Sequence, residues 1–487
     1  MDKRWILVID SYEGLYKQAA NALSGAVSGY LDYVLPVKPV DTASDEELQN
    51  SNIIVIGRTE TNRLLRKCGA RKWLDVPAQG EGYSIYVGES ILDPQKQMIA
   101  IAGFDAPGVF YGCMDFCNRY CGNQLHQEGY LMSKTFFDNR FDKVLPAWQV
   151  SRCPAIKTRA LWTWGHVIYD YRAFFDNMAK LRLNEAVIWN DRVPLNANDV
   201  ADYAHSLGIK VIWGFAWGWN NKCEEHLKNF DFDTLPRLKE NVLQTYENQY
   251  ANTGGDGIYF QSFTEVSSAY VGEKCIAQVV TELVNDIAGV LLERHPGLHI
   301  QFGLHATSVT TKLDILKGVD KRVHIVWEDC GAFPYNYNPW EIKNFSETLQ
   351  LTRKLLTLRG PDERFGAVLK GMLNLDWLRF EHFTDSYILG ERTKQYLQDR
   401  QADKNRIWKI IQASWLKNAA YVRSTVALMA REGSCPIVQA LVEDAIFENE
   451  IAFPVALYAE LLWTPETDLD VLIEEVAKFP CVHFANG

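Results

Sequence analysis

The sequence predicts an α/β protein in which a small α/β accessory domain precedes a (β/α)8 TIM barrel. The chain has 487 residues, a length that accommodates a barrel of about 250 residues with one or two flanking units. Downstream of residue 155, short apolar runs alternate with helical stretches, and several runs stop at Trp, His, Asp or Glu. This rhythm is typical of a barrel, which carries functional side chains where its strands end. We expect the accessory domain over residues 1–145 and the barrel over residues 146–487.

The accessory domain is predicted from alternating strand and helix patterns. An apolar run at residues 5–9 is too short for a signal peptide and ends at Asp10, so we expect a first strand there. Gly and Pro between residues 103 and 112 indicate a turn from a strand into a helix. The expected strands are 5–9, 52–56, 82–87 and 98–102, with helices at 14–23 and from Glu60.

The barrel is expected to contain eight strands with helices between them. A passage near 400–432 is helical and is expected as an insertion between strands seven and eight. The expected helices include 199–207, 235–250 and 274–294, and the last is ended by His-Pro-Gly. The expected strands are 160–164, 185–189, 210–215, 257–261, 299–304, 324–327, 367–373 and 454–461.

Composition limits the partners. With 50 Lys and Arg against 61 Asp and Glu, the formal net charge is -11, which disfavours nucleic acid and anionic membranes. No stretch approaches the roughly 20 apolar residues that cross a membrane. Ten cysteines without a leader predict reduced thiols in the cytoplasm. The oligomeric state stays open, with a homo-oligomer as one outcome.

Cys113, Cys117 and Cys121 recur at every fourth residue and share one face of a predicted helix. This spacing fits either a metal site or small side chains that pack the helix. Packing is the preferred interpretation, because no second Cys or His cluster accompanies them at zinc-like spacing. We expect neither a metal nor a cofactor.

The ends of the first three predicted barrel strands are rich in Trp and polar residues. Indole rings pack against the CH faces of sugars while nearby polar groups bond the hydroxyls, so this combination indicates carbohydrate binding. Each Trp taken alone fits core packing better than substrate binding, and we expect only two or three to touch a substrate. The residues are Trp162, Trp164 and His166, then Trp189, Asn190, Asp191 and Arg192, then Trp213, Trp217 and Trp219.

Glu265 is the candidate general acid. The segment 254–265 joins an apolar strand to polar groups and stops at this carboxylate. Glycoside hydrolysis generally needs two carboxyl groups, one protonated and one ionised. Burial beside Phe263 and tryptophans is expected to keep Glu265 protonated near neutral pH. The alternative is a structural hydrogen-bond acceptor or a Glu at a helix N-terminus.

The second carboxylate has three candidates. Glu328 and Asp329 emerge together from strand six, and only one of two successive strand residues faces the pocket. Asp376 follows strand seven and is the third candidate. Each acid could instead bond a sugar hydroxyl or brace an Arg. Further expected substrate-binding residues are Gln261, His305, Trp377 and Trp463.

Four segments resemble known glycosidases. Residues 81–87 and 103–112 resemble the accessory domain that precedes the barrel of β-hexosaminidases (glycoside hydrolase family 20) and α-glucuronidases (family 67). The stretch 257–265 is similar to strand four of family 67, which ends in the general-acid Glu, and of family 20, which ends in Asp-Glu. Residues 456–468 resemble the last barrel strand of this group. The resemblance implies a glycosidase with Glu265 as general acid and an oligosaccharide as substrate.

The sequence also departs from both families. Thr264 stands where family 20 has the Asp that orients an acetamido group, and Val266 follows Glu265 where family 67 has glycine. The sugar therefore stays open, whereas the resemblance to family 67 implies inversion at the anomeric carbon.

Two other classes of function remain. A catalytically inactive carbohydrate-binding barrel would keep the tryptophans without needing Glu265. A barrel lyase or isomerase would need metal ligands or a Schiff-base Lys, for which Lys370 in strand seven is the candidate.

Overall fold

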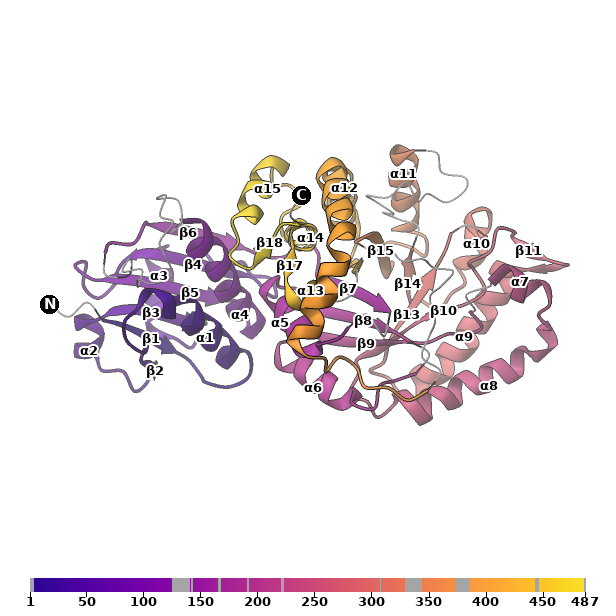
Figure 1. The fold of residues 1–487 in the computed structure, drawn as a ribbon, viewed down its shortest axis with the longest axis horizontal. Coiled ribbons are helices and arrows are strands. Elements are labelled where there is room, and N and C mark those ends of the chain that lie inside the picture. The colour runs from indigo at the N-terminus through magenta and orange to yellow at the C-terminus, as the bar shows by residue number, and fades with distance from the viewer. Residues whose placement is uncertain are drawn as a thin grey trace.

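Two α/β units lie side by side in the computed structural model (Figure 1). The first contains the N-terminal sheet and the second contains the barrel. The C-terminal elements lie at the junction between the units. The structure describes residues 4–124, 141, 143–164, 168–190, 192–219, 223–306, 308–328, 344–372, 385–442 and 446–485.

The first unit is a six-stranded sheet in the order β2-β1-β3-β5-β4-β6. Its strands are parallel except β4, which pairs antiparallel with β5 and β6. The strands are β1 (Trp5–Ile9), β2 (Val37–Pro39), β3 (Asn52–Gly57), β4 (Tyr83–Glu89), β5 (Gln97–Gly103) and β6 (Trp148–Arg152). The helices and helical turns are α1 (Gly14–Val27), η1 (Ser28–Tyr30), α2 (Asp45–Asn50), α3 (Arg63–Ala70), α4 (Ala106–Asp115) and η2 (Phe116–Gln124).

The four predicted strands of this sheet are confirmed, whereas β2 and β6 were not predicted. Both unpredicted strands lie at the edges of the sheet and are partly exposed, so neither shows the apolar run that marks a central strand. Because β6 ends at Arg152, the first sheet takes its last strand from beyond the expected boundary at residue 145.

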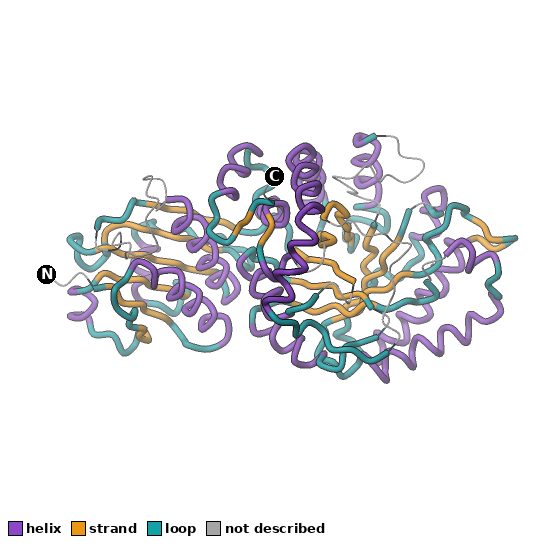
Figure 2. The backbone as a smooth tube through the Cα atoms, viewed as in Figure 1, coloured by secondary structure: helices purple, strands orange, loops and turns teal. Residues whose placement is uncertain are grey.

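The second unit is a closed barrel of eight parallel strands, as predicted, and Figure 2 shows helices around its strands. The strands are β7 (Thr158–Trp164), β8 (Glu185–Trp189), β9 (Lys210–Gly214), β10 (Gly257–Gln261), β13 (His299–Leu304), β14 (His324–Trp327), β15 (Phe365–Met372) and β16 (Ile437–Val442). The barrel closes where β16 pairs with β7. Seven of the eight expected strands are confirmed.

The eighth strand is a correction. Residues 454–461 lie inside helix α14 (Phe453–Trp463), and β16 closes the barrel instead. All residues of α14 are buried, so its sequence is apolar all round and shows neither the period of a strand nor that of an amphipathic helix. The likeness of residues 456–468 to a last barrel strand is therefore wrong.

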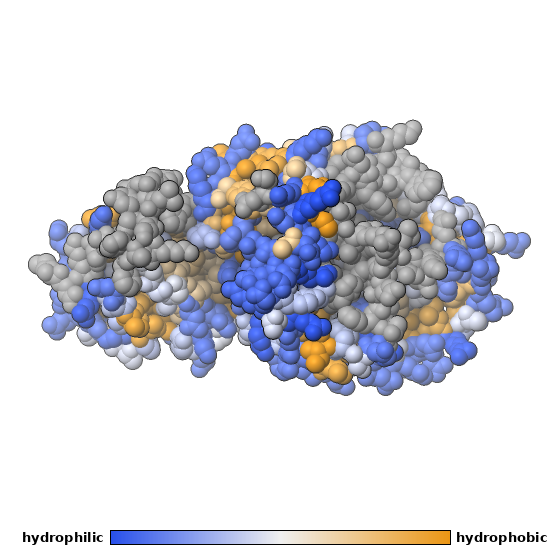
Figure 3. Space-filling view, in the orientation of Figure 1, coloured by the Kyte–Doolittle hydropathy of each residue, from blue (hydrophilic) through white to orange (hydrophobic). Residues whose placement is uncertain are grey.

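Helices and short elements connect the barrel strands. Helix α12 (Lys394–Glu432) lies between β15 and β16, as predicted, and Figure 3 shows hydrophilic residues gathered where it crosses the molecule. The other helices are α5 (Tyr171–Lys180), α6 (Ala197–Ser206), α7 (Cys223–Lys228), α8 (Leu235–Thr245), α9 (Ile276–Arg294), α10 (Leu313–Leu316), α11 (Phe345–Leu355), α13 (Ile446–Asn449) and α15 (Leu469–Ala477). The remaining elements are η5 (Phe232–Thr234), η6 (Tyr246–Tyr250), β11 (Tyr270–Val271), β12 (Lys274–Cys275), η7 (Thr310–Lys312), β17 (Ile451–Ala452) and β18 (Val482–His483). Among the described helices, none is long and apolar enough to span a membrane.

The cysteines of α4 and η2 pack inside the first unit. Cys113 and Cys121 are buried, and burial raises the pKa of both thiols well above the usual value. Burial also raises the pKa of Cys117 to about 12. Neutral thiols on a buried helix face support the packing interpretation.

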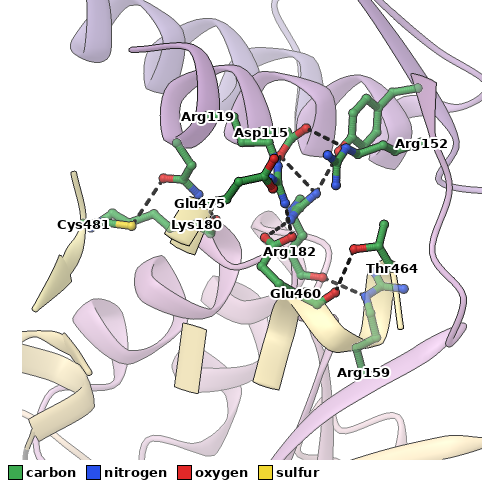
Figure 4. A network of polar contacts seen from close by, with 12 residues as sticks. Asp115, Arg119, Arg152, Arg159, Lys180, Arg182, Glu460, Thr464, Glu475 and Cys481 are labelled. Carbon is green, nitrogen blue, oxygen red and sulfur yellow. Dashed lines mark hydrogen bonds and ion pairs between the residues drawn. The ribbon is translucent and has the colours of Figure 1, made fainter. Parts of the chain in front are cut away.

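A buried ion-pair network joins the two units (Figure 4). Arg182, just before β8, pairs with Glu460 of α14 and lies 3.3 Å from Asp115 of α4. Arg119 of η2 contacts Asp115 at 2.8 Å and Glu460 at 2.5 Å, and it also pairs with Glu475 of α15. Residues from α4 and η2, from the segment before β8, and from α14 and α15 therefore meet beside the N-terminal ends of β7 and β8.

Trp463 belongs to this junction. Its ring lies under the guanidinium groups of Arg159 and Arg182, at 4.9 and 4.5 Å from the ring centroid. Tyr83 and Tyr111 of the first unit pack against the same ring. The structure therefore places Trp463, which was predicted to bind substrate, in a helix at the opposite end of the barrel from the predicted site.

Candidate functional site

The barrel strands present alternate side chains to the barrel interior and to the surrounding helices. On β10, Tyr259 packs inside the barrel, whereas Phe260 belongs to the core between strands and helices. Because side chains alternate along a strand, Gln261 shares the inner face with Tyr259. The interior cluster consists of Trp162, Val187, Trp189, Ile212, Tyr259, Val326, Val368 and Leu441.

Glu328 lies directly after β14 at the C-terminal end of the barrel, and its carboxylate is 4% exposed. The Tyr259 hydroxyl donates to Oε1 at 2.8 Å, and Gln261 Nε2 donates to the same oxygen at 2.5 Å. Burial and the nearby Glu328 raise the pKa of Tyr259 well above its ordinary value, so its hydroxyl keeps its proton. Donors directed at a carboxylate favour its ionised form.

His305 follows β13 and lies between two carboxylates. Its ring is 5% exposed, with Nε2 3.0 Å from Glu328 Oε2 and 3.8 Å from Glu265 Oε1. Both distances are measured from Nε2, so Glu265 Oε1 and Glu328 Oε2 can be no farther apart than the sum of these two distances. The sequence prediction thus named three residues, Glu265, His305 and Glu328, that the fold brings together.

Glu265 lies in the turn after β10. Trp219 Nε1 donates to its Oε2 at 2.7 Å, and Ser308 donates to the Thr264 carbonyl at 2.7 Å, which ties the turn to the segment after β13. The side chain of Glu265 is 44% exposed. The expected burial is therefore wrong: Phe263 is buried, but its apolar ring does not cover the carboxylate.

Three tryptophans and Tyr259 form an aromatic wall below the acids. Trp219 meets Trp189 edge to face at 5.9 Å, and Trp189 meets Tyr259 in the same manner at 5.9 Å. Trp162 packs against Tyr259 at 5.7 Å. Edge-to-face contacts are favourable for aromatic rings, so the buried Trp162 and Trp189 support the partly exposed Trp219.

Trp217 occupies a different environment. Its buried ring stacks on Phe260 at 3.6 Å in the core between strands and helices. Gly218 separates Trp217 from Trp219 and has a φ of 82°, with Phe263 only 2.4 Å from the position of an added Cβ. This left-handed residue lets the chain direct Trp219 toward Glu265 while Trp217 faces the core. The prediction that Trp217 joins the carboxylates at the strand ends is therefore wrong.

The other predicted residues differ in placement. Asn190 is buried at the end of β8, where its backbone N–H donates to Gly214 at 3.2 Å. Arg192 is exposed, and its carbonyl accepts a bond of 3.1 Å from the Tyr387 hydroxyl. Outside the described residues lie His166, Asp191, Asp329, Asp376 and Trp377, together with the side chains of Trp164 and Lys370.

Tyr259 was not among the predicted site residues, and Trp219 was one of three tryptophans predicted at the end of strand three. Tyr259 could have been found from the strand period, because it precedes Gln261 by two residues on the same face. Trp219 could not have been chosen over Trp217 from sequence, because the choice depends on the conformation of Gly218. Within the described part of the chain, no group of three or more His, Cys, Asp or Glu side chains is arranged to hold a metal ion.

No family model and no curated protein matches this chain. Among solved structures, it is similar to a GH138 enzyme targeting pectin rhamnogalacturonan II, with 11% identity and a TM-score of 0.49 over 96% of this chain and 51% of that one. The chain thus spans about half the length of that enzyme. A β-N-acetylhexosaminidase from Bacteroides fragilis NCTC 9343 has 11% identity and a TM-score of 0.40, covering 76% of this chain and 71% of its own.

A third similar structure is a D-psicose 3-epimerase from Clostridium cellulolyticum H10. It has 13% identity and a TM-score of 0.33, covering 66% of this chain and 96% of its own. The neighbours thus include glycoside hydrolases and an isomerase. At these identities and TM-scores the function has to be inferred from the residues of the site.

Proposed function

We propose that this protein is a glycoside hydrolase that cleaves a glycosidic bond of an oligosaccharide, with Glu265 as general acid and Glu328 as the second carboxylate. The observation that carries this proposal is the pair of carboxylates on either side of His305 Nε2. Glycosidases of most families need two such groups flanking the scissile bond. The predicted cytoplasmic location remains a prediction.

The environments of the two acids assign their roles. Glu328 is buried and receives bonds from Tyr259 and Gln261, so it is suited to stay ionised and to act as nucleophile or base. Glu265 has an exposed side chain, so it can reach the oxygen of a leaving group that enters from solvent. Two carboxylates with unlike surroundings are the usual way to separate an acid from a base.

Trp219 is the proposed sugar platform. Its ring is partly exposed, and its Nε1–H donates a hydrogen bond to Glu265. A sugar stacked on this ring would therefore lie beside the acid. Trp162 and Trp189 are buried beneath it, and we propose that they support the platform without touching the sugar.

The stereochemical outcome is open to both classes of mechanism. The limit set by His305 applies to one oxygen of each carboxylate, so it admits the spacing of about 5 Å found in retaining enzymes and the spacing of about 6.5 to 9.5 Å found in inverting enzymes. The resemblance to family 67 implies inversion. Proton NMR of the first-formed product anomer tests this point.

A panel of glycosides tests the proposed activity. It should contain aryl α- and β-glycosides of neutral sugars, hexuronic acids and N-acetylhexosamines, together with natural oligosaccharides. The α-glucuronidase-like and β-N-acetylhexosaminidase-like activities come first because of the resemblance. The proposal is supported if the wild type hydrolyses one of these glycosides and the Glu328→Gln variant does not. Binding of a sugar without turnover by the wild type would instead indicate a carbohydrate-binding barrel.

A further inference from the structure

His305 offers one donor to two carboxylates. A single nitrogen, Nε2, lies 3.0 Å from Glu328 and 3.8 Å from Glu265. The first distance is that of a hydrogen bond and the second is too long for one. A ring nitrogen carries one hydrogen, so this donor serves one carboxylate at a time.

The proposed reaction moves negative charge between these same two carboxylates. In their proposed roles, Glu328 enters the reaction as the carboxylate and Glu265 as the acid that gives a proton. As the C–O bond breaks, its electron pair stays with the leaving oxygen, which takes the proton of Glu265. Glu328 gives an electron pair to the anomeric carbon or, in an inverting enzyme, takes a proton from the attacking water. The charge has then passed from Glu328 to Glu265 in either case.

We propose that His305 is a positioning residue whose Nε2–H follows this charge, bonding Glu328 before glycosidic cleavage and Glu265 after it. The inference rests on the proposed function. It explains why the resting structure shows the short distance to Glu328 and the longer one to Glu265. The His305 ring is buried beside both carboxylates, so a small shift of the ring brings its donor to Glu265 when that carboxylate becomes charged.

The shift of the His305 donor stabilises the ionised form of Glu265. In the resting structure it accepts a bond from Trp219 at Oε2, while Oε1 faces His305. Hydrogen bonds to charged groups are stronger than bonds between neutral groups. His305 therefore stabilises Glu265 more after the proton has left than before, which is the differential interaction that speeds a chemical step.

The test compares His305→Phe, which keeps a ring without a donor, with His305→Gln, which keeps an amide donor. Each is assayed on a natural oligosaccharide, whose departure needs the proton of Glu265, and on an aryl glycoside with a good leaving group, whose departure does not. We expect His305→Phe to lower kcat about 10- to 100-fold on the oligosaccharide, with a penalty several times smaller on the aryl glycoside. His305→Gln should recover most of the loss.

The controls separate this role from a structural one. His295→Phe removes another histidine that pairs with a carboxylate, Glu247. His295 caps α9 before β13, whereas His305 follows β13, so this variant should leave both rates unchanged. In a Glu265→Gln background no charge arrives at residue 265, so His305→Phe should cost both substrates equally. Thermal melts check that each variant is folded.

The outcomes distinguish the inference from the proposed function. If the wild type hydrolyses glycosides but His305→Phe costs both substrates equally, His305 does not follow the charge and the inference fails alone. An unchanged kcat in His305→Phe would also overturn it. If the wild type hydrolyses no glycoside in the panel, the proposed function fails and this inference fails with it.

Discussion

The two ends of the barrel treat buried charge in opposite ways. At the N-terminal end, Arg119 and Arg182 meet Asp115 and Glu460, and all four side chains are almost fully buried. At the C-terminal end, two carboxylates share His305, and Glu265 is nearly half exposed. The first arrangement fixes charges in pairs, whereas the second leaves a carboxylate free to meet solvent and substrate.

Under the proposed function, this contrast assigns stability to one end of the barrel and chemistry to the other. Burial alone would raise the pKa of Asp115, but Arg182, Arg119 and Arg152 outweigh it and lower the pKa below the usual value. An acid with a lowered pKa stays ionised near neutral pH, so it is unsuited to proton transfer there. In barrel enzymes, residues at the N-terminal face generally serve stability and those at the C-terminal face serve catalysis.

The largest expected effect comes from breaking the N-terminal network. Arg182→Leu removes a buried cation and leaves Glu460 and Asp115 without one of their partners. Removing one partner of a buried ion pair typically costs about 3 to 5 kcal/mol, so chemical denaturation should show a loss of that size. The kcat of the folded variant should be unchanged. A large fall in kcat at unchanged stability would contradict the division between the two ends.

A smaller effect, of roughly 3 kcal/mol, is expected from Glu185, a buried acid at the N-terminal end whose burial outweighs the attraction of Lys210. Gln301 donates to it at 2.9 Å, and burial raises its pKa from 4.5 to about 7. Between these two values the unfolded chain ionises while the folded protein holds the proton, so stability falls as pH rises. Below pH 4.5 both states are neutral and the contribution vanishes.

Glu185→Gln isolates this contribution, because an amide cannot ionise and still accepts the bond from Gln301. The unfolding free energy of the variant relative to the wild type should rise between pH 4.5 and about 7 and level off above. Denaturant titrations across this range measure the difference. A difference that does not change with pH would show that Glu185 is ionised in the folded protein.

The smallest expected effect comes from Trp219→Phe at the C-terminal end. The change keeps an aromatic ring against Trp189 but removes the donor to Glu265 Oε2. A hydrogen bond to a charged group contributes roughly 1.5 to 3 kcal/mol. Because part of this stabilisation is present in both the ground state and the transition state, kcat should fall only about 10-fold. Trp217→Phe is the matched control: its ring stacks on Phe260, so stability should fall while kcat holds. The reverse pattern would contradict the placement of the two tryptophans.

Much of the fold was predictable because short apolar runs indicate regular strands. Seven barrel strands and Glu265, His305 and Glu328 follow from such runs and from what stands at their ends. Helix α14 was mistaken for a strand because its residues are buried on every side, and burial on all sides erases the period that separates a helix from a strand.

The details of the site were less predictable. Gly218 decides which of two neighbouring tryptophans meets Glu265, and its positive φ depends on the packing of Phe263. The exposure of Glu265 likewise depends on how the turn after β10 is held by Ser308. Tertiary contacts of this kind leave no pattern in a local stretch of sequence.

Glu265→Gln, assayed on leaving groups of different pKa, tests the central claim most directly. The variant keeps an acceptor for the Trp219 indole but has no proton to give. The account predicts that hydrolysis of a natural oligosaccharide falls about 10²-fold or more, while an aryl glycoside with a good leaving group loses much less. Equal losses on both substrates, or a rate equal to that of the wild type on the oligosaccharide, would contradict the assignment of Glu265 as the general acid.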